Sequence, residues 1–185
     1  MAEQSTPNPI ELYEAASQRA RQVIAGVKES QLSDPTPCAD WNVQALRDHL
    51  VGGPSLGYGM LAGLGRQPAP EAATPQDSYQ EGVARFTAEA RKAGALDQTL
   101  EAVGGMSGAQ FMMTLFMDTF IHSWDLAKAT GQDTNLDGGL ASVIYEAWQP
   151  NMDGLRASGR VGAAVQVPED ASVQDKLIAM MGRQP

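Results

Sequence analysis

Apolar side chains recur every three to four residues along most of the chain, which is the period of an amphipathic α-helix. The four long segments with this pattern cover residues 9–30, 42–64, 74–94 and 109–130. A fifth helix is predicted after a cap at Asp137, and a short last helix over residues 171–181 after a cap at Asp170, with an extended segment at 161–167 between them. The pattern therefore predicts an all-α fold, a four-helix bundle with a short C-terminal helical appendage.

Glycine and proline interrupt this pattern at two places. Pro54 follows two glycines inside the second segment and leaves the Leu50 carbonyl without its helical partner, so we expect a kink or a break there. The glycine-rich stretch 103–108 precedes the fourth segment. Because neither a preceding strand nor a following Gly-Lys-Ser/Thr accompanies it, we interpret it as a turn rather than a phosphate loop.

Length and charge narrow the classes of function. The 185 residues favour one domain over residues 1–185. The 22 acidic and 13 basic side chains give a net charge of −9, which disfavours nucleic acids and anionic membranes as partners. No apolar run reaches transmembrane length, and the N-terminus has no signal-peptide pattern. With Cys38 as the one cysteine, no internal disulfide can form, so we expect a cytoplasmic protein.

Both histidines fall on the apolar sides of predicted helices. His122 lies four residues after Asp118, so the two side chains share one helix face at roughly 5–6 Å between Cβ atoms. A carboxylate in apolar surroundings is costly unless it is paired or bound to a cation. With His49 from the second helix as a third ligand, the set matches a catalytic zinc site with an open position and also suits other divalent metals. The alternative is a buried Asp118–His122 ion pair without a metal.

Four further residues near these histidines have two interpretations each. Asp125, three residues after His122, either orients that ligand or is a solvated acid, and we favour a structural role. Trp41 and Trp124 either line a pocket or belong to the core. Cys38 is interpreted as a small buried side chain rather than a nucleophile, because the sequence places no obvious base near it.

Two motifs surround the histidines. The first reads TPCADWNV at residues 36–43 and is followed by His49, and the second reads IHSWDLAKATG at residues 121–131. In this order they resemble the signatures of the DinB-like, mycothiol-dependent maleylpyruvate isomerase superfamily. Residues 167–185 resemble the tail of a short-chain subgroup, mostly of unknown activity, so the similarity covers nearly the whole chain.

The resemblance implies a DinB/YfiT-like four-helix bundle that holds a divalent metal, commonly zinc, through His49, Asp118 and His122. Relatives often have a glutamate where Asp118 stands. Because aspartate is one methylene shorter, the metal would lie closer to the fourth predicted helix.

The resemblance also implies an enzyme that uses a low-molecular-weight thiol, mycothiol or an equivalent, as cosubstrate. A thiol bound at the open metal position would lose its proton, since the charge of the metal stabilises the thiolate. The thiolate would attack an electrophilic small molecule in an S-transfer, or add reversibly to a conjugated bond in an isomerisation. The alternatives are a non-catalytic metal- or ligand-binding bundle and a metal-dependent hydrolase. Apolar helix faces are also compatible with a homodimer.

Overall fold

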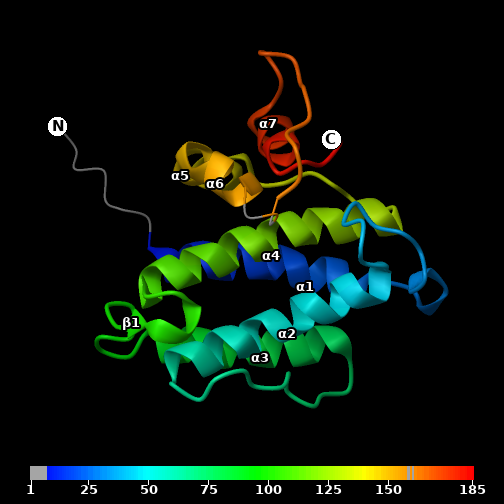
Figure 1. Ribbon diagram of the computed structural model, residues 1–185. Helices are drawn as coiled ribbons and strands as arrows, with labels where there is room; N and C mark the ends of the chain where they lie inside the picture. Colours follow the sequence, from blue (N-terminus) through cyan, green and yellow to red (C-terminus); the bar gives the residue numbers. More distant parts are fainter. Residues whose placement is uncertain (1–7, 158, 160) are drawn as a thin grey trace. The chain divides into compact units, whose positions relative to one another are not determined.

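The computed structural model describes residues 8–157, 159 and 161–185 (Figure 1). Its described part is mostly helical with one small two-stranded sheet, so the predicted all-α fold is confirmed. The chain divides into two compact units, Met1–Gln132 and Asp133–Pro185. The prediction of a single domain over residues 1–185 stays a prediction. Within the described residues, no helix combines the length and the apolar character that a membrane crossing needs.

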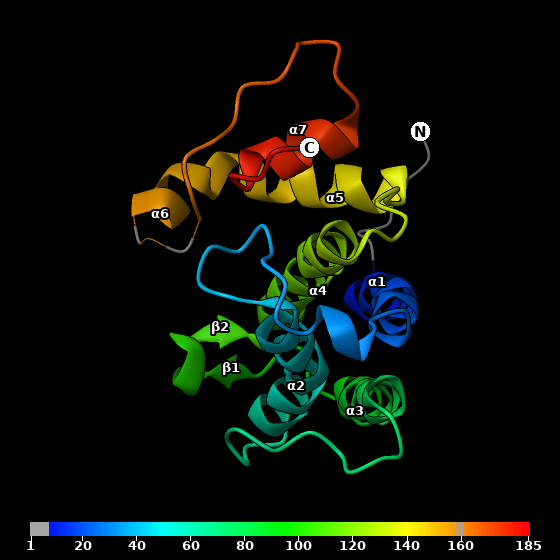
Figure 2. The ribbon, with the colours of Figure 1, turned by 90° about the vertical axis from the view of Figure 1, so that its right-hand side faces the viewer.

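The first unit is a four-helix bundle. Its helices are α1 (Pro9–Ala25), α2 (Val43–Leu61), α3 (Pro75–Ala90) and α4 (Gly108–Thr130). Both α3 and α4 pack against α1 and against α2, which closes the bundle (Figures 1 and 2). One cluster of its buried side chains comprises Ala20, Val23, Ile24, Val43, Leu46, Leu50, Tyr79, Leu126 and Ala127. This core brings the first half of α2 next to α4, and these two helices carry the histidines.

Side-chain caps begin these helices where the sequence places polar residues. The Asn8 carboxamide oxygen accepts from the Ile10 amide at 3.0 Å, and Asn42 accepts from the Ala45 amide at 2.9 Å. Each cap satisfies a backbone N–H that has no partner within the helix, so the helix starts are local properties of the sequence. The first helix ends earlier than predicted, at residue 25 rather than 30, and the 3-10 turn Glu29–Gln31 follows.

Of the kink or break predicted at Pro54, the break is wrong, since α2 continues to Leu61, and the kink stays a prediction. Pro54 is buried against α3, where a Cβ on Gly82 would lie 3.1 Å from the Pro54 Cβ. A proline inside a helix costs about 3 kcal/mol. Packing of α2 on α3 and α4 offsets this local cost, and a sequence pattern alone does not contain that contribution.

The glycine-rich stretch before α4 forms a turn, as predicted. It connects β1 (Thr99–Leu100) to β2 (Met106–Ser107) in an antiparallel pair, after the 3-10 turn Glu101–Val103. Gly104 and Gly105 have φ of 80° and 76°, a left-handed conformation that favours glycine. The Ser107 side chain then caps α4.

The second unit contains α5 (Gly138–Trp148), the 3-10 turn Gln149–Asn151, α6 (Met152–Ala157) and α7 (Val173–Met180), with α5 packed on α7. Asp137 caps α5 as predicted. The cap of α7 is Ser172, whose hydroxyl accepts from the Asp175 amide at 3.0 Å, so the predicted cap at Asp170 is wrong. Residues 161–167 form no strand, and their predicted extended conformation stays a prediction.

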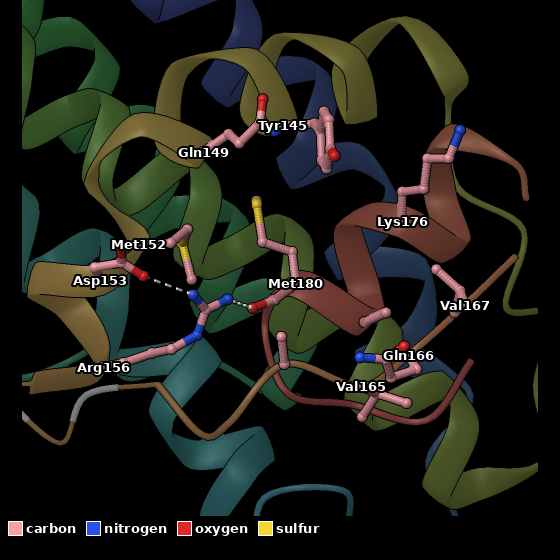
Figure 3. Close-up of a pocket in the computed structure, with 12 residues that line it drawn as sticks. Tyr145, Gln149, Met152, Asp153, Arg156, Val165, Gln166, Val167, Lys176 and Met180 are labelled. Carbon is pink, nitrogen blue, oxygen red and sulfur yellow. Dashed lines mark hydrogen bonds and ion pairs between the residues drawn. The ribbon is translucent and has the colours of Figure 1, made fainter. Parts of the chain in front are cut away.

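A pocket of about 370 Å³ lies within this second unit, between α5, α6, α7 and residues 164–167 (Figure 3). The Arg156 guanidinium lies along it and donates to the Met180 carbonyl at 3.0 Å and to the Asp153 carboxylate at 3.3 Å. These bonds connect α6 to the end of α7, so the arginine has a structural role in this unit.

Candidate metal centre

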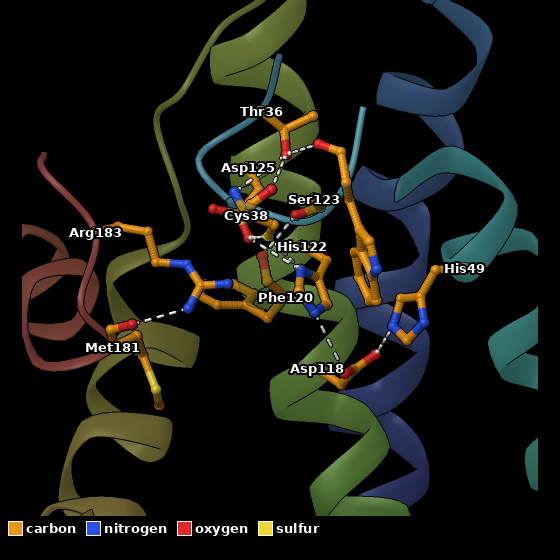
Figure 4. A network of polar contacts seen from close by, with 11 residues as sticks. Thr36, Cys38, His49, Asp118, Phe120, His122, Ser123, Asp125, Met181 and Arg183 are labelled. Carbon is orange, nitrogen blue, oxygen red and sulfur yellow. Dashed lines mark hydrogen bonds and ion pairs between the residues drawn. The ribbon is translucent and has the colours of Figure 1, made fainter. Parts of the chain in front are cut away.

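The structure brings the three predicted ligands together. His49 lies on α2, and Asp118 and His122 lie one turn apart on α4. One ligand atom from each lies within 4.8 Å of the others (Figure 4). The side chains are 33%, 30% and 14% exposed, in that order, so solvent reaches the group without surrounding it.

Asp118 lies between the two imidazoles (Figure 4). Its Oδ2 is 2.9 Å from His49 Nε2, and its Oδ1 is 3.5 Å from His122 Nε2. Both rings therefore direct the same type of nitrogen towards one carboxylate. This arrangement offers two nitrogen donors and one anionic oxygen donor, and it also permits direct hydrogen bonds from imidazole to carboxylate.

Asp125 contacts the other nitrogen of His122. Its Oδ2 is 2.9 Å from His122 Nδ1, and its side chain is completely buried. The interpretation of Asp125 as a solvated acid is therefore wrong. The contact is of the kind that orients a metal-binding histidine in proteins.

Cys38 reaches the same carboxylate from the loop before α2. Its Sγ lies 3.2 Å from Asp125 Oδ2 and 3.7 Å from His122 Nδ1. The expectation that no base lies near this cysteine is therefore wrong. Cys38, His122 and Asp125 form a second group whose ligand atoms lie within 4.8 Å of one another. This group could not be predicted from the spacing of its residues, because 84 and 87 residues separate the cysteine from its two partners.

The two tryptophans have different surroundings. The Trp41 ring centroid lies 4.6 Å from that of His49 and 5.3 Å from that of His122, so its ring covers one side of the histidine pair. Trp41 also lines a pocket of about 490 Å³ along its loop. Trp124 is 2% exposed and belongs to the core.

Two buried tyrosines lie in the core near Asp118. The Tyr13 and Tyr79 hydroxyls are buried together with the Ser17 hydroxyl, and the side chains of Ser17 and Thr119 are the polar groups nearest to both phenols. Burial raises the pKa of both phenols, and the negative charge of Asp118 adds to this effect. Burial therefore favours the uncharged form of both phenols in the folded protein.

The pH dependence of stability follows from these two tyrosines. Because the folded-state pKa lies above the unfolded value of about 10, their contribution to the unfolding free energy is complete below about pH 10 and decreases as the pH rises further. We expect urea midpoints to fall above about pH 10. The decrease should be smaller in Tyr79→Phe and unchanged in the control Tyr58→Phe, which leaves both buried phenols in place. Equal slopes in Tyr79→Phe and the unsubstituted protein would contradict this prediction.

The sequence of this chain matches one family model and two curated proteins. The family model described as the mycothiol maleylpyruvate isomerase N-terminal domain matches residues 13–127, a range that includes His49, Asp118 and His122. Two curated relatives are uncharacterized proteins of Mycobacterium tuberculosis, from strains CDC 1551 / Oshkosh and ATCC 25618 / H37Rv. Each is 29% identical over 189 residues, which cover 95% of this chain and 98% of the relative. No solved structure matches the chain significantly.

Proposed function

The chain belongs to the family of the mycothiol maleylpyruvate isomerase N-terminal domain, and from this membership we propose a divalent-metal-dependent enzyme that uses a low-molecular-weight thiol such as mycothiol. The main observation in support of the proposal is that ligand atoms of His49, Asp118 and His122 lie within 4.8 Å of one another, between α2 and α4. The proposed reaction is an S-transfer to an electrophilic small molecule or the isomerisation of one.

The donor set fits a divalent cation. Two imidazole nitrogens and one carboxylate oxygen are the ligands of many catalytic zinc sites, in which three protein ligands leave a position for a further molecule. The same set accommodates other divalent metals, and zinc is the ion that we propose. Partial exposure of all three side chains is compatible with access for a small molecule.

A divalent cation bound there would supply the positive charge that stabilises a thiolate. The residues of the chain would provide the rest of the site. Asp118 holds the two histidines on a common side, as its contacts with both Nε2 atoms indicate. The Trp41 ring lies against both imidazoles and limits the approach of water from that side. The buried Asp125 contacts the ring nitrogen of His122 that faces away from Asp118.

Calorimetric titration with mycothiol tests this function. We expect the zinc-loaded protein to release or absorb heat on binding mycothiol, and the metal-free protein to bind it at least about tenfold more weakly, because the thiolate loses its charge partner. A mycothiol derivative alkylated on sulfur is the matched ligand control, since it cannot form a thiolate. Equal binding of both ligands, or no binding to the zinc-loaded protein, would contradict the proposal and favour a non-catalytic metal-binding bundle.

The proposed location in the cell follows from the proposed use of a thiol. A single cysteine and a thiol cosubstrate both suit a reducing compartment, so the cytoplasm is the proposed location. The homodimer stays a prediction.

A further inference from the structure

The turn that carries Cys38 is fixed by its own hydrogen bonds. The Thr36 hydroxyl accepts from the Cys38 amide at 3.1 Å and donates to the Trp41 carbonyl at 2.8 Å. The Trp41 amide donates to the Cys38 carbonyl at 2.9 Å, and the Val43 amide to the Asp34 carbonyl at 3.0 Å. The Cys38 thiol is therefore held in one place beside α4.

Two hydrogen-bond donors meet on one oxygen of Asp125. Its Oδ2 is 3.2 Å from Cys38 Sγ and 2.9 Å from His122 Nδ1 (Figure 4). The Asp125 side chain is completely buried, so this oxygen is shielded from bulk water. Because an ionised carboxylate only accepts hydrogen bonds, the thiol and the ring nitrogen both direct their hydrogens to it.

The hydrogen on Nδ1 determines whether Nε2, on the other side of the His122 ring, carries a hydrogen or a lone pair. A neutral imidazole carries one hydrogen, so Nε2 keeps its lone pair and presents it towards Asp118, which lies 3.5 Å away. We infer that Asp125 and Cys38 are positioning residues, which together hold the ring and the tautomer of His122 so that Nε2 faces the candidate metal centre. The effect on metal binding rests on the proposed function, whereas the tautomer of His122 does not.

The alternative role for Cys38 is that of a metal ligand together with Asp125 and His122. A neutral His122 has one lone pair, so it cannot serve this group through Nδ1 and the His49–Asp118 group through Nε2 at the same time. The distance of 2.9 Å between Nδ1 and Oδ2 is the usual length of an N–H···O hydrogen bond. The contacts therefore favour the positioning role.

Nitrogen-15 NMR of the histidine side chains tests the inference in the metal-free, full-length protein. The chain has two histidines, so their signals are separated by one variant, His49→Asn. We expect His122 to carry its hydrogen on Nδ1, since this nitrogen lies 2.9 Å from Asp125 Oδ2. In Cys38→Ala the Nδ1–H resonance should move downfield, because Oδ2 loses the Cys38 thiol as a donor, and Cys38→Ser should restore it. Ser123→Ala is the matched control, since that hydroxyl donates to the Phe120 carbonyl and not to Asp125.

Metal binding gives the second measurement. We expect the Kd for zinc to rise about tenfold in Cys38→Ala and to stay near the original value in Cys38→Ser, since partners of metal-binding histidines typically change affinity 10- to 100-fold. A hydrogen on Nε2 of His122, or an unmoved Nδ1–H resonance in Cys38→Ala, would overturn the inference. A sulfur-to-metal charge-transfer band in the cobalt-loaded protein that disappears in Cys38→Ser would also overturn it, because Cys38 would then be a ligand. If the NMR results hold and no zinc binds, the proposed function fails and the positioning of His122 stands.

Discussion

Replacing His122 by alanine is expected to remove the bound divalent ion. The substitution leaves His49 and Asp118, and a site with two protein ligands holds zinc far more weakly than one with three. We expect an affinity loss of more than about 100-fold, beyond the effect typical of residues that only support a ligand. Elemental analysis of tag-free protein, purified without a metal-affinity column, should find about one ion per chain in the unsubstituted protein and almost none in the variant.

The matched control for this experiment is Thr114→Ala. Thr114 lies on the same helix, is half-buried, and donates its hydroxyl to the Gln110 carbonyl at 3.1 Å, so its loss should leave the ion in place. Urea unfolding of each variant separates loss of the ion from loss of the fold. Full retention of the ion in His122→Ala would show that it binds elsewhere. An unsubstituted protein that takes up no ion, even after dialysis against zinc, would support the alternative of a metal-free Asp118–His122 pair.

The part of the site that could be predicted from the sequence is the part built by one helix. Asp118 and His122 are four residues apart, so helical geometry alone places them on one face. The position of His49 could not be predicted from helix geometry alone. Its distance from Asp118 and His122 depends on which helices of the bundle are neighbours. The sequence offered His49 as the third ligand because it is the other histidine and falls on a second predicted helix, and the family resemblance implied the same residue. Whether these residues hold a metal stays a prediction.

The contact between Cys38 and Asp125 could not be predicted from spacing. Cys38 lies in a loop whose path is set by hydrogen bonds of Thr36 and by pairing of residues 34 and 43. Its carboxylate partner is 87 residues away and on another element. No periodic pattern contains this information, so a search for a base near the cysteine in the sequence could not find Asp125.

The helix boundaries show the same division between local and distant causes. The caps of α1 and α2 lie within three residues of the amides that they bind, and these starts were predicted correctly or to within a residue. The end of α1 was not. Its Val23 carbonyl accepts from the Gln132 side chain at 3.0 Å, a partner 109 residues away. The division is not complete, because the cap of α7, Ser172, is a local residue that the sequence pattern also missed.

Replacing Asp118 by asparagine is expected to weaken the binding of divalent ions about 100-fold, which corresponds to about 2.7 kcal/mol at 25 °C. Asparagine keeps the shape of the side chain but removes its charge. The carboxylate is the anionic member of the three-residue group, and neutral histidines offer the ion no charge to replace it. Competition with a chelator of known affinity measures the effect.

Asp118→Glu is the matched variant, since it keeps the charge and adds one methylene. Because the resemblance places a glutamate at this position in many relatives, we expect Asp118→Glu to bind zinc within about tenfold of the unsubstituted protein, no more than the effect typical of changing a residue that contacts a metal ligand. Equal zinc affinity in Asp118→Asn and in the unsubstituted protein would show that the carboxylate does not bind the ion. Its contact with His49 at 2.9 Å would then be a structural hydrogen bond between α2 and α4, and the site would need a ligand other than Asp118.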